Sequence, residues 1–404
     1  MIKYFFCLLL FIFLIPLKII PCTTAIISGK ITPDGRPLLW KNRDTDDLYN
    51  NLIYINGSKY SYIAIVNSND KNPGQVWIGM NNAGFSIMNS VSYNLEPGDT
   101  TKLKDREGVI MRLALETCEN VDDFEKLLKT YKKPLGVQTN FGVIDAFGNG
   151  AYFETSNYFY KKYDLNDGTV APDGYLLRTN FSVCGIPDEG SGYERFDIES
   201  ELFKSAYKNK NLTPKFIVQD AARCLKHSIT KVDLKNEYSD NPSEKKYVDF
   251  NDFIPRYSTS ASVVIQGVKK GESPELSTMW NVLGFPLCSV VYPVWFNSEN
   301  NLPDILKAGT DGNSELCKLS LKLKNKCFSL KKGKKQNYLN INALYNGEGT
   351  GIMQKLRPIE DYVFLSTEDI LIKFREGSFT ANDIKLYYNH IDSIIISKLK
   401  SIID

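Results

Sequence analysis

The sequence predicts an α+β fold built on antiparallel sheets, and three observations lead to this prediction. A hairpin pattern occupies residues 22–44. Strand-like and helix-like segments then come in blocks, without the βαβ alternation that produces a parallel sheet. With 404 residues, 43% of them hydrophobic, the chain can bury a substantial core. Because no repeat or linker divides it, we expect one domain over residues 22–404.

The first predicted element is the hairpin itself. Residues 22–27 are rich in β-branched side chains and indicate a strand. Pro33-Asp34-Gly35 is a turn signal, and an apolar run resumes at residue 38. Positions 22 and 44 are symmetric about residue 33, so an antiparallel hairpin returns Asp44 to the neighbourhood of Cys22.

The later elements are predicted from periodicity, capping and turn residues. Asn120, with Asp123 three residues on, is typical of a helix N-terminus. Gly148-Asn149-Gly150 is typical of a turn between two strands. The expected helices cover residues 108–118, a segment after 120, 216–228 and 379–403; the expected strands cover residues 141–145, 151–154, 261–266 and 289–294.

Composition excludes several classes of function. The formal net charge is +2, and the only basic cluster is residues 331–335, so we expect no nucleic-acid partner. The two histidines, His227 and His390, rule out zinc sites built on paired histidines. Neither lies beside a nucleophile motif, so the base of a hydrolase would be another group. We expect no metal and no cofactor.

Residues 1–21 are predicted to be an export signal or pro-segment that is removed on maturation. Lys3 precedes an apolar run from residue 4 to 17, which is shorter than the ~20 residues of a spanning helix. No later segment is apolar for long enough to cross a bilayer. The mature protein is expected to be periplasmic or extracellular. Ile19-Ile20-Pro21 is a poor signal-peptidase site, so either an unusual cut or self-processing exposes Cys22.

Cys22 has two mutually exclusive interpretations. A cysteine after an apolar run can carry a lipid anchor, but a lipidated cysteine can be neither nucleophile nor base. This one leads directly into a predicted sheet, which favours an N-terminal nucleophile. A free α-amino group, with a pKa of about 8, suits a general base, and it lies on the same residue as the thiol.

The residues then resemble a known family. The opening Cys-Thr-Thr-Ala-Ile, the block ending in Asp44, the Asn-Ala-Gly-Phe segment at 82–85 and Arg178-Thr179-Asn180 occur in the family's order and spacing. They resemble the linear-amide hydrolases of the N-terminal-nucleophile (Ntn) superfamily, which includes the choloylglycine hydrolases. The similarity covers roughly residues 22–300 and is closest to the penicillin acyltransferase-like branch. It implies a four-layer αββα sandwich.

The resemblance also implies roles for single residues. Cys22 corresponds to the nucleophile, and Asp44 to the carboxylate that holds its amine. Asn180 resembles the asparagine of the family's Thr-Asn motif, which contributes to the oxyanion hole. Arg195 resembles the active-site arginine that follows it, and Asn89 is a looser match for a second oxyanion residue.

Three features leave alternatives open. Lys41 stands where many relatives have arginine, which keeps the charge but loses a bidentate contact. Asn180-Phe181-Ser182 is also a glycosylation sequon, as are the sites at Asn56 and Asn211, and a glycan on Asn180 would exclude an oxyanion role. Six cysteines without CxxC spacing permit up to three disulfides: Cys118, Cys184, Cys224, Cys288, Cys317 and Cys327.

The sequence therefore predicts an exported hydrolase that cleaves the carbon–nitrogen bond of a small-molecule linear amide through a thioester on Cys22. Acyl transfer to an amine acceptor is the nearest variant, because both reactions share the first half-reaction. The rivals are a lipid-anchored protein without catalysis and, below it, a Cys-His protease using His227 or His390. Neither the acyl and amine parts of the substrate nor the oligomeric state can be inferred from the residues.

Overall fold

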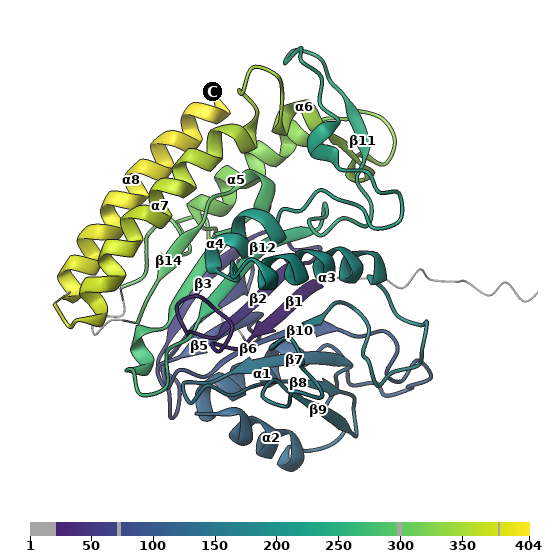
Figure 1. The fold of residues 1–404 in the computed structure, drawn as a ribbon, viewed down its shortest axis with the longest axis vertical. Helices are drawn as coiled ribbons and strands as arrows, with labels where there is room; N and C mark the ends of the chain where they lie inside the picture. Colours follow the sequence, from purple (N-terminus) through teal and green to yellow (C-terminus); the bar gives the residue numbers. More distant parts are fainter. Residues whose placement is uncertain (1–21, 71–73, 297–300, 379) are drawn as a thin grey trace, which may run out of the picture.

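The computed structural model describes residues 22–70, 74–296, 301–378 and 380–404. The predicted export signal, residues 1–21, lies outside them. Two antiparallel sheets face each other, and helices cover both outer faces (Figure 1). Strands β1 and β2 of one sheet contact β6 and β7 of the other, so the sheets form the two inner layers. The predicted α+β, four-layer αββα architecture is confirmed.

The first sheet contains the N-terminal hairpin, β1 and β2, between β10 and β12. Its six strands run in the order β10-β1-β2-β12-β13-β14. They are β1 (Cys22–Ile27), β2 (Leu38–Asp44), β10 (Tyr175–Arg178), β12 (Thr259–Gln266), β13 (Thr278–Leu283) and β14 (Tyr292–Val294). Every residue of β1 and β2 is buried, because one face of these strands meets the second sheet and the other meets the covering helices.

The second sheet is a meander of seven strands in sequence order, β3 to β9. They are β3 (Asn50–Ile55), β4 (Tyr62–Asn67), β5 (Ile78–Asn81), β6 (Ser86–Val91), β7 (Thr139–Ile144), β8 (Gly150–Thr155) and β9 (Tyr160–Asp164). A separate two-stranded sheet pairs β11 (Tyr247–Asp249) with β15 (Tyr338–Asn340).

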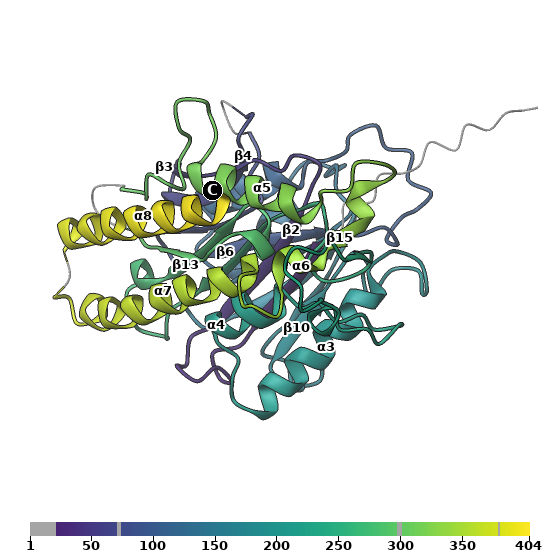
Figure 2. The ribbon, with the colours of Figure 1, turned by 90° about the horizontal axis from the view of Figure 1, so that it is seen from above.

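The two outer layers are helical and differ in size. Helices α1 (Glu107–Thr117) and α2 (Val121–Thr130) cover the second sheet over an apolar cluster that includes Phe124 and Phe141. The first sheet is covered by α3 (Tyr193–Lys208), α4 (Pro214–Phe216), α5 (Glu315–Cys327), α6 (Ile341–Leu344), α7 (Ile352–Arg375) and α8 (Ala381–Ile403). Seen from above, α7 and α8 lie side by side (Figure 2).

Short helical turns connect the larger elements. They are η1 (Ile217–Ala221), η2 (Leu234–Asn236), η3 (Pro274–Leu276), η4 (Pro286–Cys288) and η5 (Lys335–Asn337).

Two predicted elements need correction. The helix expected over 216–228 is wrong after Ala222, because the chain turns back on itself there. Leu234 N donates to Leu225 O at 2.9 Å, and His227 N donates to Val232 O at 3.0 Å, which a continuing helix would prevent. The strand expected over 289–294 is shorter, since only Tyr292–Val294 pairs with its neighbour.

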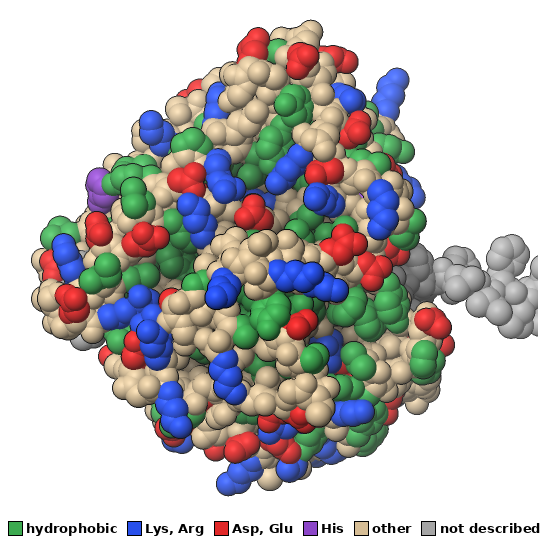
Figure 3. Space-filling model, viewed as in Figure 1, with side chains coloured by type: hydrophobic (Ala, Val, Ile, Leu, Met, Phe, Trp, Pro, Cys, Tyr) green, Lys and Arg blue, Asp and Glu red, His purple; other side chains and the backbone are tan. Residues whose placement is uncertain are grey.

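The surface shows no separation of charge on the face drawn in Figure 3, where basic and acidic side chains are interspersed. Among the described residues, none of the helices combines the length and the apolar character that crossing a bilayer requires.

Candidate active site

Cys22 begins β1, which lies between β10 and β2. It pairs with Arg43 of β2, and two residues later Thr24 pairs with both Lys41 and Arg178. Only 4% of Cys22 is exposed. Its backbone N–H donates to Oδ1 of Asn180 at 2.7 Å. Asn180 is therefore a direct hydrogen-bond partner of the Cys22 nitrogen, the atom that the sequence predicts to become the α-amino group.

Arg195 forms hydrogen bonds to both Cys22 and Asn180. Its Nη1 donates to the carbonyl oxygen of Cys22 at 2.6 Å and to Oγ1 of Thr23 at 2.8 Å. Its Nη2 donates to Oδ1 of Asn180 at 2.8 Å. Burial lowers the pKa of Arg195 to about 10, so the guanidinium remains charged at neutral pH. A buried cation therefore fixes the backbone of Cys22 and the amide of Asn180 in one network.

The local fold explains why Asn180 and Arg195 meet. Asn180 and Ser191 exchange backbone hydrogen bonds, which close the loop between β10 and α3. Gly192 then precedes α3 with φ of +86°, a conformation that favours glycine. A Cβ at this position would run into the guanidinium of Arg195. The first turn of α3 thereby directs Arg195 back toward β1.

Asp44 lies one residue beyond the partner of Cys22, at the end of β2. Its Oδ1 accepts a hydrogen bond from Oγ1 of Thr259 at 2.5 Å, and no hydrogen bond joins it to Cys22 in the described part of the chain. Burial raises the pKa of Asp44 to about 6, while the guanidinium groups of Arg195 and Arg256 act in the opposite direction. Asp44 therefore belongs to the electrostatic surroundings of the network without bonding to the amine position.

Lys41 and Asn89 connect the two sheets beside Cys22. The ammonium of Lys41, on β2, donates to Oδ1 of Asn89, on β6, at 2.7 Å and to the carbonyl of Trp77 at 3.0 Å. Burial lowers the pKa of Lys41 to about 8, and its interaction with Cys22 opposes that shift. Nδ2 of Asn89 donates to Oγ1 of Thr139 at 3.2 Å. Lys41, which the sequence left without a role, is thus the cation that holds Asn89.

Arg256 and Glu199 belong to the same surroundings, although the sequence did not single them out. Arg256 forms an ion pair with Asp252 at 2.6 Å and influences both Asp44 and Arg195. Glu199 lies one helical turn after Arg195, is fully buried, and its carboxyl oxygens have no hydrogen-bond partner among the described residues. Burial raises its pKa well above the ordinary value. The signal for Glu199, a spacing of four residues from Arg195, depends on α3, which was not predicted. Arg256 lies outside the regular elements and has no such signal.

The contacts of the two histidines and of Asn180 bear on the Cys-His alternative and on the sequon. Nδ1 of His227 accepts hydrogen bonds from backbone N–H groups two and three residues on, and Nε2 of His390 lies 2.8 Å from the hydroxyl of Tyr362. Neither contacts Cys22. Asn180 is fully buried and its Nδ2 donates to the carbonyl of Val91, so no space for a glycan surrounds it.

The described residues contain neither a disulfide nor a cluster of metal ligands. All seven cysteines within the described ranges are free thiols, and two of them, Cys288 and Cys327, lie with their sulfurs 3.5 Å apart. The described residues contain no group of three or more His, Cys, Asp or Glu side chains that could hold a metal ion.

A cavity of about 380 Å³ adjoins the network at Asn180. Val91 and Tyr93 line it, and both are hydrogen-bonded to Asn180, through the carbonyl of Val91 and the N–H of Tyr93. Glu107 lines it as well and interacts with Lys41, and burial raises the pKa of Glu107 to about 7. The cavity therefore lies next to the partners of Asn180, although neither Cys22 nor Asn180 lines it, and it has the size of a small-molecule pocket.

Comparison with known proteins gives one family. The model of the acyl-coenzyme A:6-aminopenicillanic acid acyl-transferase family matches residues 31–269, which is more than half of the chain. No curated protein matches the sequence.

Several solved structures are similar. A mutant of conjugated bile acid hydrolase from Clostridium perfringens is 13% identical, with a TM-score of 0.41 over 70% of this chain and 93% of that chain. The N-acylethanolamine-hydrolyzing acid amidase ortholog of Caenorhabditis elegans is 15% identical, with a TM-score of 0.40 over 63% of this chain and 93% of that one. Penicillin V acylase from Agrobacterium tumefaciens is 13% identical, with a TM-score of 0.34 over 68% and 86%.

Proposed function

The chain belongs to the acyl-coenzyme A:6-aminopenicillanic acid acyl-transferase family, and on this premise we propose that it cleaves the carbon–nitrogen bond of a linear amide with Cys22 as the nucleophile. One observation carries the proposal. Asn180 and Arg195, from separate segments, both bond to the backbone of Cys22 in a buried site. A strand that begins at an ordinary structural cysteine needs no such network.

The reaction begins when Cys22 is the first residue. Its α-amino group, held by Oδ1 of Asn180, takes the proton of the thiol, and the sulfur attacks the amide carbon. The carbonyl oxygen becomes an oxyanion, for which Asn180 and Asn89 are the proposed donors. The buried cations Arg195 and Lys41 add favourable electrostatics where negative charge develops.

The second half of the reaction releases both products. As the carbon–nitrogen bond breaks, the α-ammonium returns its proton to the leaving amine, and a thioester remains on Cys22. Water then adds to the thioester carbon and loses a proton to the α-amino group. The carbon–sulfur bond breaks to release the acid, and the α-ammonium returns its proton to the thiolate of Cys22. If an amine takes the place of water, the same thioester yields a new amide. The two outcomes differ only in the acceptor, and product analysis with and without added amine distinguishes them.

Maturation and export form part of the proposal. The apolar run before Cys22 supports removal of residues 1–21 and delivery outside the cytoplasm. The 4% exposure of Cys22 disfavours the rival lipid anchor, since a diacylglyceryl group on a sulfur must reach a membrane. Mass spectrometry of the mature N-terminus tests both points. A free Cys22 is expected, and a lipidated Cys22 or a chain that retains residues before it would refute the mechanism.

Covalent labelling tests the nucleophile. A thiol-reactive amide mimic should modify Cys22 in the mature protein, and Cys22→Ala should abolish the modification. Cys184→Ala is the matched control, because Cys184 is the most exposed of the described cysteines and has no place in the network. Labelling that persists in Cys22→Ala, or that disappears in Cys184→Ala, would contradict the assignment. His227→Ala and His390→Ala should each retain activity.

A further inference from the structure

The C-terminal helical pair lies beyond the segment that the family model matches. Helices α7 and α8 follow residue 269 by more than eighty positions and run against each other along one side of the molecule (Figures 1 and 2). Their buried residues, such as Leu356 and Val363 of α7 and Ile391 and Ile395 of α8, join the main core. Because the pair is anchored there, its outward side is a fixed surface.

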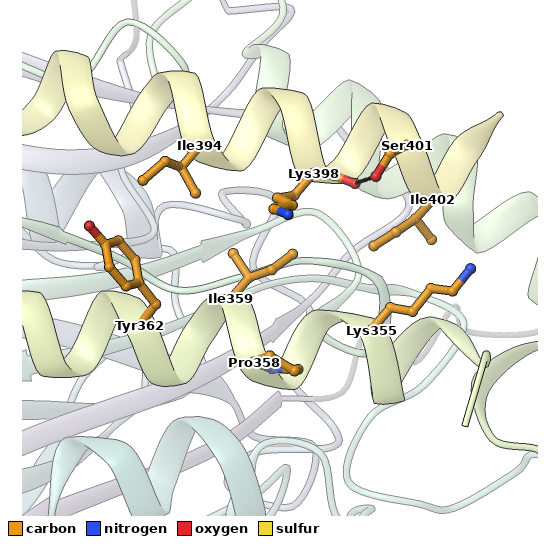
Figure 4. A pocket seen from close by; sticks show the side chains of 8 residues that line it. All are labelled: Lys355, Pro358, Ile359, Tyr362, Ile394, Lys398, Ser401 and Ile402. Carbon is orange, nitrogen blue, oxygen red and sulfur yellow. Dashed lines mark hydrogen bonds between the residues drawn. The ribbon is translucent and has the colours of Figure 1, made fainter. Parts of the chain in front are cut away.

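That outward side contains a groove between the two helices. Its volume is about 490 Å³, which is within the range of small-molecule pockets. The walls are mainly apolar and come from Pro358, Ile359 and Tyr362 of α7 and from Ile394 and Ile402 of α8 (Figure 4). One end is bordered by Tyr362, whose hydroxyl lies 2.8 Å from Nε2 of His390.

Two cations complete the lining of the groove. Lys355 of α7 and Lys398 of α8 reach it from opposite helices, and no acidic residue lines it (Figure 4). Neither ammonium group has an ion-pair or hydrogen-bond partner among the described residues. A third cation, Lys326, donates to the carbonyls of Ile402 and Ile403 and holds the end of α8 in place.

We propose that this groove binds a single-chain amphiphile with a carboxylate head, of the fatty-acid class. The tail lies along Ile359 and Ile394, and the carboxylate lies between Lys355 and Lys398. Charge complementarity selects an anionic head, because both lysines lack a counter-charge and no carboxylate of the protein competes with the ligand. The concave shape selects one chain rather than the flat face of a bilayer. The proposal does not rest on chemistry at Cys22.

Titration calorimetry with the full chain tests it. Dodecanoate, dodecanol and dodecyltrimethylammonium are compared below their micelle concentrations, in the wild-type protein and in Cys22→Ala, which separates binding in the groove from turnover. We expect dodecanoate to bind most tightly and the cationic analogue to show no binding. Each methylene removed from the carboxylate should weaken binding about two- to fourfold, since the tail is buried in an apolar groove.

Substitutions in the groove test whether the ligand binds there. Lys355→Gln combined with Lys398→Gln should weaken dodecanoate binding about tenfold and abolish the preference over dodecanol. Ile394→Gln should weaken all chain lengths. Leu365→Gln is the control, because Leu365 is a residue of α7 with 67% exposure that does not line the groove. Thermal unfolding confirms that each variant remains folded.

Several results would overturn the proposal. Equal binding of the anionic and cationic analogues would remove the role of the lysines. Unchanged binding in the double lysine variant would place the ligand elsewhere. Binding to anionic vesicles without binding to monomeric dodecanoate would identify a membrane-contact surface instead. Dimerisation that Ile394→Gln abolishes would identify a second copy as the occupant.

Discussion

Replacing Asp44 by asparagine should stabilise the protein at neutral pH while it lowers activity. Asp44 is 3% exposed, and within the described part of the chain its carboxylate accepts one hydrogen bond, from Thr259. Asparagine keeps an Oδ1 acceptor for that bond and has almost the same shape. The variant therefore removes mainly the negative charge, whose desolvation is the largest influence on the pKa of this carboxyl.

The expected magnitude follows from the raised pKa. At about 1.4 kcal/mol per pKa unit, a rise from 3.8 to about 6 corresponds to about 3 kcal/mol. The folded state holds the proton more tightly than the unfolded state, so ionisation costs stability as the pH rises from the lower value to the higher. Asp44→Asn should match the wild type near pH 4, and it should be more stable by about 3 kcal/mol above about pH 7.

Urea unfolding at several pH values measures this difference. Asp197→Asn is the matched control, because it removes a carboxylate from the exposed side of α3. Only Asp44→Asn should gain stability between about pH 4 and about pH 7. If it instead loses stability relative to the wild type over this range, then the cations around Asp44 outweigh its burial, and the reasoning is wrong. Turnover by the same variant should fall, because a charge beside the network is lost.

Arg195→Lys keeps the charge but replaces the two donor nitrogens, Nη1 and Nη2, by one, so it cannot hold Cys22 and Asn180 in the same geometry. Turnover should fall about a hundredfold in steady-state assays, and near-normal turnover would show that the hydrogen bond from Arg195 to Asn180 is dispensable. Gly192→Ala should cost about 1–2 kcal/mol in urea unfolding, because a left-handed residue gains a Cβ that meets the guanidinium; an unchanged midpoint would contradict this. Mild oxidation should join Cys288 to Cys327 before any other described pair, since their sulfurs are 3.5 Å apart, and peptide mapping that finds another pair first would exclude it.

The hairpin shows how much of the site the sequence contains. The turn at Pro33-Asp34-Gly35 and the two apolar runs predict the return of residue 44 to residue 22, and the observed partner of Cys22 is Arg43, one position away. The family assignment, made from local motifs, is confirmed by the family model. Local patterns suffice here because turn residues determine the register of a hairpin over a few positions.

Local sequence patterns do not predict contacts between segments that are far apart in the sequence. Lys41 of β2 donates to Asn89 of β6 across the space between the two sheets. The periodicity of a strand does not show which strand of the other sheet it faces. The nitrogen of Cys22 donates to Asn180, whereas Asp44 accepts a hydrogen bond from Thr259. Which of the two side chains meets Cys22 depends on side-chain directions at the ends of two strands. The helix that carries Arg195 was not predicted, since its start depends on a left-handed glycine and a loop closed by Asn180.

The network around Cys22 also has a consequence for the time at which the cysteine becomes reactive. Its partner Asn180 is 158 positions away in sequence, and Arg195 is 173 positions away. Contacts of such long range form late, after the intervening chain has been made and has folded. A newly synthesised chain therefore carries a thiol near its beginning without the groups that would direct it. Reactivity at Cys22 is a property of the finished fold, acquired only when α3 docks against β1.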